Sequence, residues 1–91
     1  MSDKIHCAHI LVKTETEAKA ILKRLNEGEK FANVAKQVSL CPSAKRGGDL
    51  GNFGRGVMVK EFETAAFALG KGENSLPIKT KFGYHVIRRL E

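Results

Sequence analysis

The sequence has few cysteines and no long apolar run, and both absences restrict the kind of protein it encodes. Its two cysteines, Cys7 and Cys41, are too few and too far apart for a disulfide framework, so we expect reduced thiols. No stretch reaches the roughly 18 apolar residues that a membrane span requires. The N-terminal residues also lack the apolar region of a signal peptide. The sequence therefore predicts a cytoplasmic protein with no membrane span.

Motifs for metal and nucleotide binding are also missing. His6, Cys7 and His9 are close in sequence, but alternation along a strand would place His6 on the face opposite Cys7 and His9. The chain has no C-x-x-C pair of the kind found in many zinc sites. It also has no P-loop and no G-x-G-x-x-G segment that opens a helix after a strand. We therefore predict no metal and no cofactor.

The charge balance is basic. Lys and Arg number 16 against 10 acidic residues, which gives a net charge of +6. Such an excess favours acidic partners such as nucleic acid, anionic surfaces or acidic peptides. The lysines are spread along the chain rather than clustered, so a solvated basic surface is the simpler interpretation. We expect only weak, non-specific binding to acidic partners.

Ninety-one residues suffice for one domain, which we expect to extend over residues 1–91. Hydrophobic periodicity and turn residues predict a strand over 5–13, a helix from Thr14 to Gly28 and a second helix over 31–38. A glycine-rich loop follows over 41–56, with a short strand at 49–53. The chain then continues with a helix over 62–69, closed by Gly70, and a hairpin of strands at 77–81 and 84–90. Helices and strands are mixed without strict alternation, which indicates an α+β domain with helices packed on a small, largely antiparallel sheet.

Histidines are the first candidates for chemistry. His9 lies in the first predicted strand and His85 in the last, both among apolar residues. If these strands are neighbours, the two rings can hydrogen-bond each other, and the residues alone leave a structural pair and an active site equally open. Cys41, which precedes Pro42, allows a nucleophile hypothesis, although no acyl-enzyme motif surrounds it. A small hydrolase therefore stays an alternative.

Apolar residues on or beside the glycine-rich loop form a second candidate group. Leu50, Met58 and Phe62 are ordinary core residues by type. A glycine-rich loop can also support a small apolar pocket, so core packing and ligand binding both stay open for these three.

Four segments taken together resemble the parvulin family over nearly the whole chain. Residues 9–12 are similar to the family's opening strand, and residues 39–51, with the sequence SLCPSAKRGGDLG, are similar to its signature loop. The pattern continues over residues 53–63, and residues 82–87 are similar to the closing strand. Any one segment is a modest hint, but their shared order is specific.

This resemblance implies a four-stranded antiparallel sheet surrounded by helices, in the order β-α-α-(short α)-β-α-β-β. It implies a peptidyl-prolyl cis/trans isomerase that acts on Xaa-Pro bonds in polypeptides, assists protein folding and needs no cofactor. We expect a monomer by default, because the sequence shows no obvious spare apolar face. The catalytic positions that match the family pattern are His9, Cys41, Thr80 and His85. The positions that correspond to the proline pocket are Leu50, Phe53, Met58, Phe62 and Phe82.

One departure from the family bears on specificity. Parvulins directed to phosphorylated sites carry an arginine-bearing basic loop after the first strand, whereas residues 13–19 here contain no arginine and two glutamates. Glutamates repel a phosphate, so we predict no strong phosphoserine or phosphothreonine preference. Two alternatives use the same fold without strong catalysis: a peptide-holding chaperone and a basic adaptor for nucleic acid.

Overall fold

The sheet of this protein has four strands in the order β2-β1-β4-β3, and each neighbouring pair is antiparallel. The computed structural model describes residues 4–91. Its elements are β1 (Ile5–Val12), α1 (Glu15–Asn26), α2 (Phe31–Val38), the 3-10 helix η1 (Pro42–Arg46), β2 (Asp49–Phe53), α3 (Lys60–Ala68), β3 (Ile78–Thr80) and β4 (Gly83–Arg89). The predicted α+β architecture with a four-stranded antiparallel sheet is confirmed.

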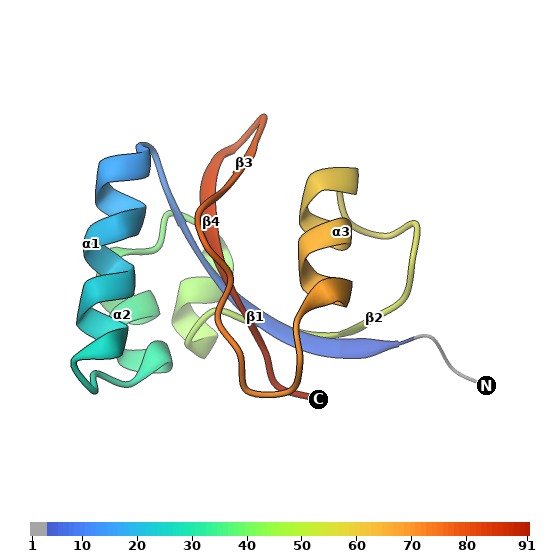
Figure 1. Cartoon of the computed structure of the whole chain (residues 1–91), viewed down its shortest axis with the longest axis horizontal. Helices are drawn as coiled ribbons and strands as arrows, with labels where there is room; N and C mark the ends of the chain where they lie inside the picture. The colour runs from blue at the N-terminus through green and yellow to red at the C-terminus, as the bar shows by residue number, and fades with distance from the viewer. Residues whose placement is uncertain (1–3) are drawn as a thin grey trace.

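The helices cover both faces of the sheet. Figure 1 shows α1 and α2 on one side of β1 and β4, and α3 on the other. Side chains of β1 alternate between the two sides, as the pleat of a strand requires. Ala8 and Ile10 belong to the hydrophobic cluster that includes α1 and α2 residues, whereas Ile5 and Cys7 belong to the cluster that includes α3 residues. Each face of the central strands is therefore buried.

Helix α1 begins where the sequence predicts. The Thr14 hydroxyl accepts a hydrogen bond from the Glu17 backbone N–H at 3.2 Å and donates one to the Glu17 carboxylate at 2.9 Å. An N-cap of this kind satisfies one of the free N–H groups of the first turn and stabilises a helix by about 1 kcal/mol. The helix ends at Asn26, close to the predicted stop at Gly28.

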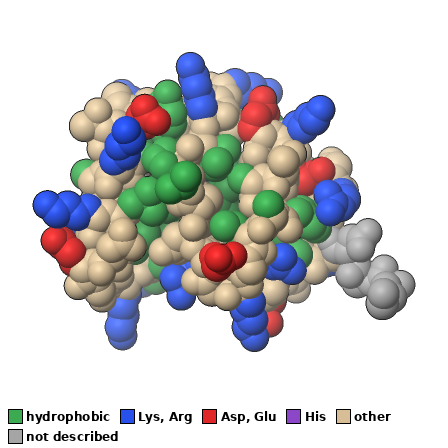
Figure 2. Space-filling view, in the orientation of Figure 1, with side chains coloured by type: hydrophobic (Ala, Val, Ile, Leu, Met, Phe, Trp, Pro, Cys, Tyr) green, Lys and Arg blue, Asp and Glu red, His purple; other side chains and the backbone are tan. Residues whose placement is uncertain are grey.

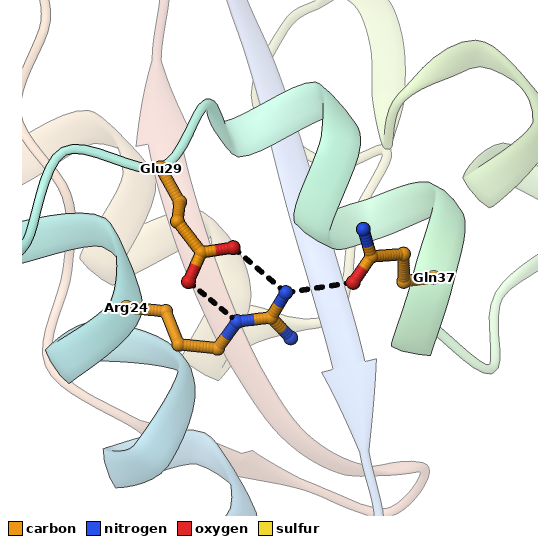
Figure 3. Close-up of polar contacts among 3 residues, drawn as sticks. All are labelled: Arg24, Glu29 and Gln37. Carbon is orange, nitrogen blue, oxygen red and sulfur yellow. Dashed lines mark hydrogen bonds and ion pairs between the residues drawn. The ribbon is translucent and has the colours of Figure 1, made fainter.

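A partly exposed arginine connects the two helices on this face. Arg24 donates from Nε and Nη2 to the Glu29 carboxylate at 2.9 and 2.8 Å, and from Nη2 to the Gln37 side-chain oxygen at 2.7 Å (Figure 3). The contacts join the end of α1, the turn that follows it and the end of α2. Exposed ion pairs contribute little to stability, so these contacts mainly fix the orientation of α2 relative to α1.

The end of α3 differs from the prediction. The helix ends at Ala68, and Gly70 does not adopt the left-handed conformation of a glycine cap. The Gly70 N–H instead donates to the Glu73 carboxylate. A side-chain hydrogen bond from the following turn therefore stands where we expected a left-handed glycine cap. Within residues 4–91, no helix has both the length and the apolar character needed to cross a membrane.

Candidate active site

A cavity of about 480 Å³ lies between the central strands, α3 and the loop before η1. The tip of the β3–β4 hairpin and the N-terminal end of α3 lie at the same end of the molecule (Figure 1). Four of the predicted proline-pocket residues line the cavity: Leu50, Met58, Phe62 and Phe82. Three of the four predicted catalytic residues line it as well: His9, Cys41 and His85. Apart from the two imidazoles and the Cys41 thiol, every lining side chain is apolar.

The two histidines meet because of the strand register. In the β1–β4 pairing, His9 lies opposite Ile87 and His85 opposite Leu11, so the histidines are diagonal neighbours on one face. Their Nδ1 atoms are 2.9 Å apart, and the rings stack with centroids 5.1 Å apart. The Phe62 ring lies nearly perpendicular to both, with centroid distances of 5.5 and 5.3 Å. Both histidines are buried.

Thr80 does not line the cavity, but its hydroxyl forms a hydrogen bond with the His85 ring. Thr80 Oγ1 lies 2.7 Å from His85 Nε2 and accepts the Phe82 N–H at 3.1 Å. We assign the protons so that the Thr80 hydroxyl has an acceptor. Thr80 then donates to His85 Nε2, and His85 donates from Nδ1 to His9 Nδ1. His9 then carries its proton on Nε2, a buried nitrogen with no protein partner among the described residues.

Both imidazoles are neutral at pH 7. Burial, reinforced by the neighbouring His85, lowers the pKa of His9 from 6.5 to about 4. Burial also lowers the pKa of His85. The cavity floor therefore offers polar but uncharged groups.

Cys41 is held at the cavity by backbone contacts. The Ser39 hydroxyl accepts hydrogen bonds from the Leu11 N–H at 3.0 Å and the Cys41 N–H at 3.4 Å. The Cys41 thiol has no imidazole base among the described residues, because His85 uses both ring nitrogens and His9 Nδ1 bonds to His85. The arrangement does not support the nucleophile hypothesis, which needs a thiol–imidazole pair. Sequence reasoning missed Ser39, whose partner Leu11 is far away in the chain.

Two polar contacts fix the glycine-rich loop against β1. The His9 N–H donates to the Gly48 carbonyl at 2.9 Å, and a Cβ at Gly48 would collide with the His9 carbonyl oxygen. His6 Nε2 lies 2.6 Å from Asp49 Oδ1, which also accepts the Gly51 N–H at 2.7 Å. The hydrogen bond from His6 lowers the pKa of Asp49. These contacts place Leu50 at the cavity.

Phe53 is a correction to the predicted pocket. Its ring is buried but does not line the cavity. Phe53 lies opposite Ile5, at the end of β1 remote from His9. It contacts Phe62 and Phe67, with ring centroids 6.1 and 6.3 Å away, and so supports Phe62 within the core.

Five lining residues were not predicted: Leu11, Leu40, Pro42, Val57 and Val59. Their apolar character gave no signal, because a core residue and a cavity residue look alike in sequence. Within residues 4–91, no group of three His, Cys, Asp or Glu side chains is placed to hold a metal ion.

Comparison with known proteins identifies the family. Residues 9–91 match the family described as Rotamase, PPIC-type PPIase domain. The foldase protein PrsA 4 of Bacillus cereus is 54% identical over 86 residues, which cover 93% of this chain and 31% of that protein. This chain therefore spans less than a third of the length of that curated relative.

Two solved structures match over nearly their whole length. The parvulin NmPin of Nitrosopumilus maritimus is 53% identical with a TM-score of 0.91, and the match covers 100% of this chain and 99% of that one. Pin of Cenarcheaum symbiosum is 60% identical with a TM-score of 0.88, covering 100% and 95%. The predicted fold and enzyme class are confirmed, and the chain belongs to the PPIC-type peptidyl-prolyl cis/trans isomerase domain family.

Proposed function

We propose that this domain accelerates rotation about Xaa-Pro bonds by non-covalent means, with the proline ring held in the apolar cavity. The observation that carries the proposal is the pairing of an apolar enclosure with a neutral, hydrogen-bonded histidine pair at its base. A cavity of about 480 Å³ has room for a proline ring and part of its neighbours. Leu50, Met58 and Phe62 are the residues proposed to hold the ring.

The chemistry needs neither a nucleophile nor a charged acid. The barrier is loss of amide resonance, roughly 18–20 kcal/mol, and no bond is broken. An enzyme lowers such a barrier by binding the twisted amide more tightly than either planar form. An apolar enclosure also removes water from the planar amide, which is the more dipolar form. In this proposal, His9, His85, Thr80 and Cys41 set the polarity and shape of the cavity without forming a covalent bond.

The substrate is proposed to be unmodified polypeptide. The segment after β1 begins with Lys13 but then carries Glu15 and Glu17 in the first turn of α1. These carboxylates repel a phosphate, so a phosphorylated Ser-Pro or Thr-Pro peptide gains no advantage over its Glu analogue. A large kcat/KM advantage for the phosphopeptide would contradict this part. The cytoplasmic location, the monomeric state and the role in folding are proposed on the sequence alone.

The test is two-dimensional NMR exchange spectroscopy on short Xaa-Pro peptides with catalytic amounts of protein. We expect cis/trans exchange far above the uncatalysed rate, which corresponds to tens to hundreds of seconds. Met58→Ala removes most of an apolar side chain that lines the cavity. We expect it to lower kcat/KM at least about ten-fold, because several buried methylene contacts with the proline ring are lost. Leu76→Ala is the matched control, because Leu76 is 76% exposed and does not line the cavity.

Two results would contradict the proposal. Folded protein that produces no exchange with any peptide is not an isomerase; if it still bound those peptides, the peptide-holding alternative would replace catalysis. Equal loss of activity in Met58→Ala and Leu76→Ala would show that the cavity is not the site.

A further inference from the structure

The segment between β2 and α3, residues 54–59, carries Met58 to the cavity. In Figure 1 it runs from the end of β2 along α3 to the start of that helix. The segment contains two glycines, Gly54 and Gly56, and Gly56 has a positive φ of +85°. Glycines give a chain little preference for one conformation, so contacts outside the segment have to fix the position of Met58.

Glu63, in the first turn of α3, hydrogen-bonds to this segment on both sides of Met58. Glu63 Oε1 accepts the Gly56 N–H at 2.5 Å, and the Glu63 N–H donates to the Val59 carbonyl at 2.9 Å. Within residues 4–91, the bond from Gly56 is the only hydrogen bond that residues 55–58 make. One residue of the helix therefore holds the backbone before and after Met58.

The Glu63 carboxylate is partly buried, with its side chain 19% exposed. Figure 2 shows acidic and basic side chains interspersed on one face of the molecule, and exposed pairs of this kind contribute little to stability. The Arg55 guanidinium lies 4.2 Å from the centroid of the Phe67 ring, and its Nη1 is 3.9 Å from Glu63 Oε2. Because Arg55 is 60% exposed and this distance is long, the short bond to Gly56 is the contact that holds the segment.

The position of Met58 matters because attraction between apolar groups falls steeply with distance. A gap of about 0.5–1 Å already loses a quarter to a half of the attraction between two atoms in contact. Met58 lies two residues beyond Gly56, at most about 7 Å along the chain. Loss of the Gly56 bond therefore lets Met58 move away from a proline ring in the cavity and weakens its contacts with that ring.

We propose that Glu63 is a positioning residue of the isomerase: its carboxylate holds Gly56 and thereby fixes Met58 against the substrate proline. The inference rests on the proposed function of the domain. Glu63 does not line the cavity, so its effect on the rate passes through Met58. This dependence distinguishes the role from that of a residue that only stabilises α3.

The test is a double-mutant cycle in which NMR exchange on one Xaa-Pro peptide gives kcat/KM. We expect Glu63→Ala to lower kcat/KM about three- to ten-fold, and no more than Met58→Ala does. In the Met58→Ala background, Glu63→Ala should change kcat/KM by less than about two-fold, because the side chain that it positions is already gone. A residue that acted only on the stability of the fold would have the same effect in both backgrounds.

Two further variants identify the interaction. Glu63→Gln keeps a side-chain oxygen that can accept the Gly56 N–H, so we expect it to retain at least about half of the wild-type kcat/KM. Glu61→Ala is the matched control, because Glu61 is an exposed acid in the same helical turn and makes no hydrogen bond or ion pair among the described residues. It should leave kcat/KM unchanged.

The Gly56 amide provides a readout that does not depend on catalysis. Its proton should exchange with solvent faster in Glu63→Ala than in the wild-type protein, and Glu63→Gln should restore most of the protection. Unchanged exchange of the Gly56 proton in Glu63→Ala would contradict the assigned hydrogen bond.

Other outcomes would overturn the inference, and they can be told apart. Equal losses of kcat/KM from Glu63→Ala with and without Met58 would show that Glu63 does not act through Met58. A loss in Glu63→Gln as large as in Glu63→Ala would assign the effect to the charge rather than to the bond with Gly56. Unchanged kcat/KM in Glu63→Ala would remove the positioning role and leave the isomerase intact. Wild-type protein without exchange on any peptide would contradict the proposed function, and the positioning role with it.

Discussion

The Ser39 hydroxyl takes the place of a strand partner for Leu11. β1 pairs with β2 only as far as Ala8, so the outer edge of β1 beyond that point needs other partners. Gly48 O accepts the His9 N–H, and Ser39 Oγ accepts the Leu11 N–H at 3.0 Å. Leu40 N–H then returns a bond to the Leu11 carbonyl. This contact fixes the segment that bears Leu40 and Cys41 beside the cavity.

Ser39→Ala should lower the free energy of unfolding by about 1–3 kcal/mol, because it leaves the half-buried Leu11 N–H without its acceptor. Urea denaturation measures the loss. Hydrogen exchange at the Leu11 amide should also become faster.

Ser43→Ala is the matched control for this change. The Ser43 hydroxyl is buried but has no hydrogen-bond partner among the described groups, so removing it should leave stability unchanged or raise it. Equal losses in the two variants would contradict the assigned role of Ser39.

The histidine pair predicts a stability loss on mild acidification. Because the folded state lowers the pKa of His9 from 6.5 to about 4, the unfolded chain binds more protons between these values. The contribution of neutral His9 to the free energy of unfolding is fully present above pH 6.5. It is lost as the pH falls from 6.5 toward 4, and a pKa shift of this size corresponds to roughly 3 kcal/mol. His85 acts in the same direction. Chemical denaturation at a series of pH values measures the slope.

A variant separates this effect from the carboxylates. The carboxylates of Asp49 and Glu29 have pKa values below their usual 3.8 and 4.5. Their contributions to the free energy of unfolding are therefore lost only as the pH falls toward and below those usual pKa values. His9→Gln, which cannot titrate, should flatten the slope between pH 6.5 and about 5. An unchanged slope in this variant would show that His9 is not the group responsible.

The two cysteines should differ in reactivity. Cys7 is fully buried, and burial raises the pKa of its thiol to about 11. Cys41 is partly exposed and lines the cavity. Iodoacetamide should therefore label Cys41 in the native protein and both thiols after denaturation, since alkylation needs an accessible thiolate. An Xaa-Pro peptide should protect Cys41 from labelling. Mass spectrometry of the digested protein measures both the labelling and the protection. Labelling of Cys7 in the native protein would contradict the burial argument.

Gly48 and Gly51 test how closely the glycine-rich loop approaches β1. Both have positive φ, +84° and +73°, so alanine is strained at either site. At Gly48 the added Cβ also meets the His9 carbonyl oxygen, whereas at Gly51 nothing lies within 4 Å. We expect Gly48→Ala to lower the unfolding free energy by at least about 1–3 kcal/mol more than Gly51→Ala, because a steric clash adds to the backbone strain. Similar losses would mean that the loop can move away from β1.

Periodic patterns made most of the fold predictable. Amphipathic spacing located α1 and α2 because each helix buries one face. The alternation in β1 predicted that Cys7 and His9 share a face, and both lie on the α3 side of the sheet. The strand register was not predictable, because no local pattern records which residues of β1 and β4 lie opposite each other. Yet this register is what brings His9 to His85.

The residues alone made the histidines, Cys41 and the apolar loop residues candidates, but only the family pattern assigned them to a site. Phe53 was misplaced because an aromatic residue among glycines does not show whether it lies in the core or in a cavity. Leu40 and Val57 were missed for the related reason that exposed and buried aliphatic residues have the same sequence signature. Ser39 depends on Leu11, a contact between residues 28 positions apart.

The location of the histidines on β1 and β4 has a consequence for local opening of the protein. These strands occupy the middle of the sheet and are covered on both faces, so their amides should exchange with solvent only when the whole domain opens. Val57, by contrast, lies on an exposed turn without a sheet partner. The histidine pair and the Val57 side of the cavity should therefore fluctuate on separate timescales, so that the Val57 segment can adapt to successive substrates while the histidine pair keeps its geometry for as long as the domain stays folded.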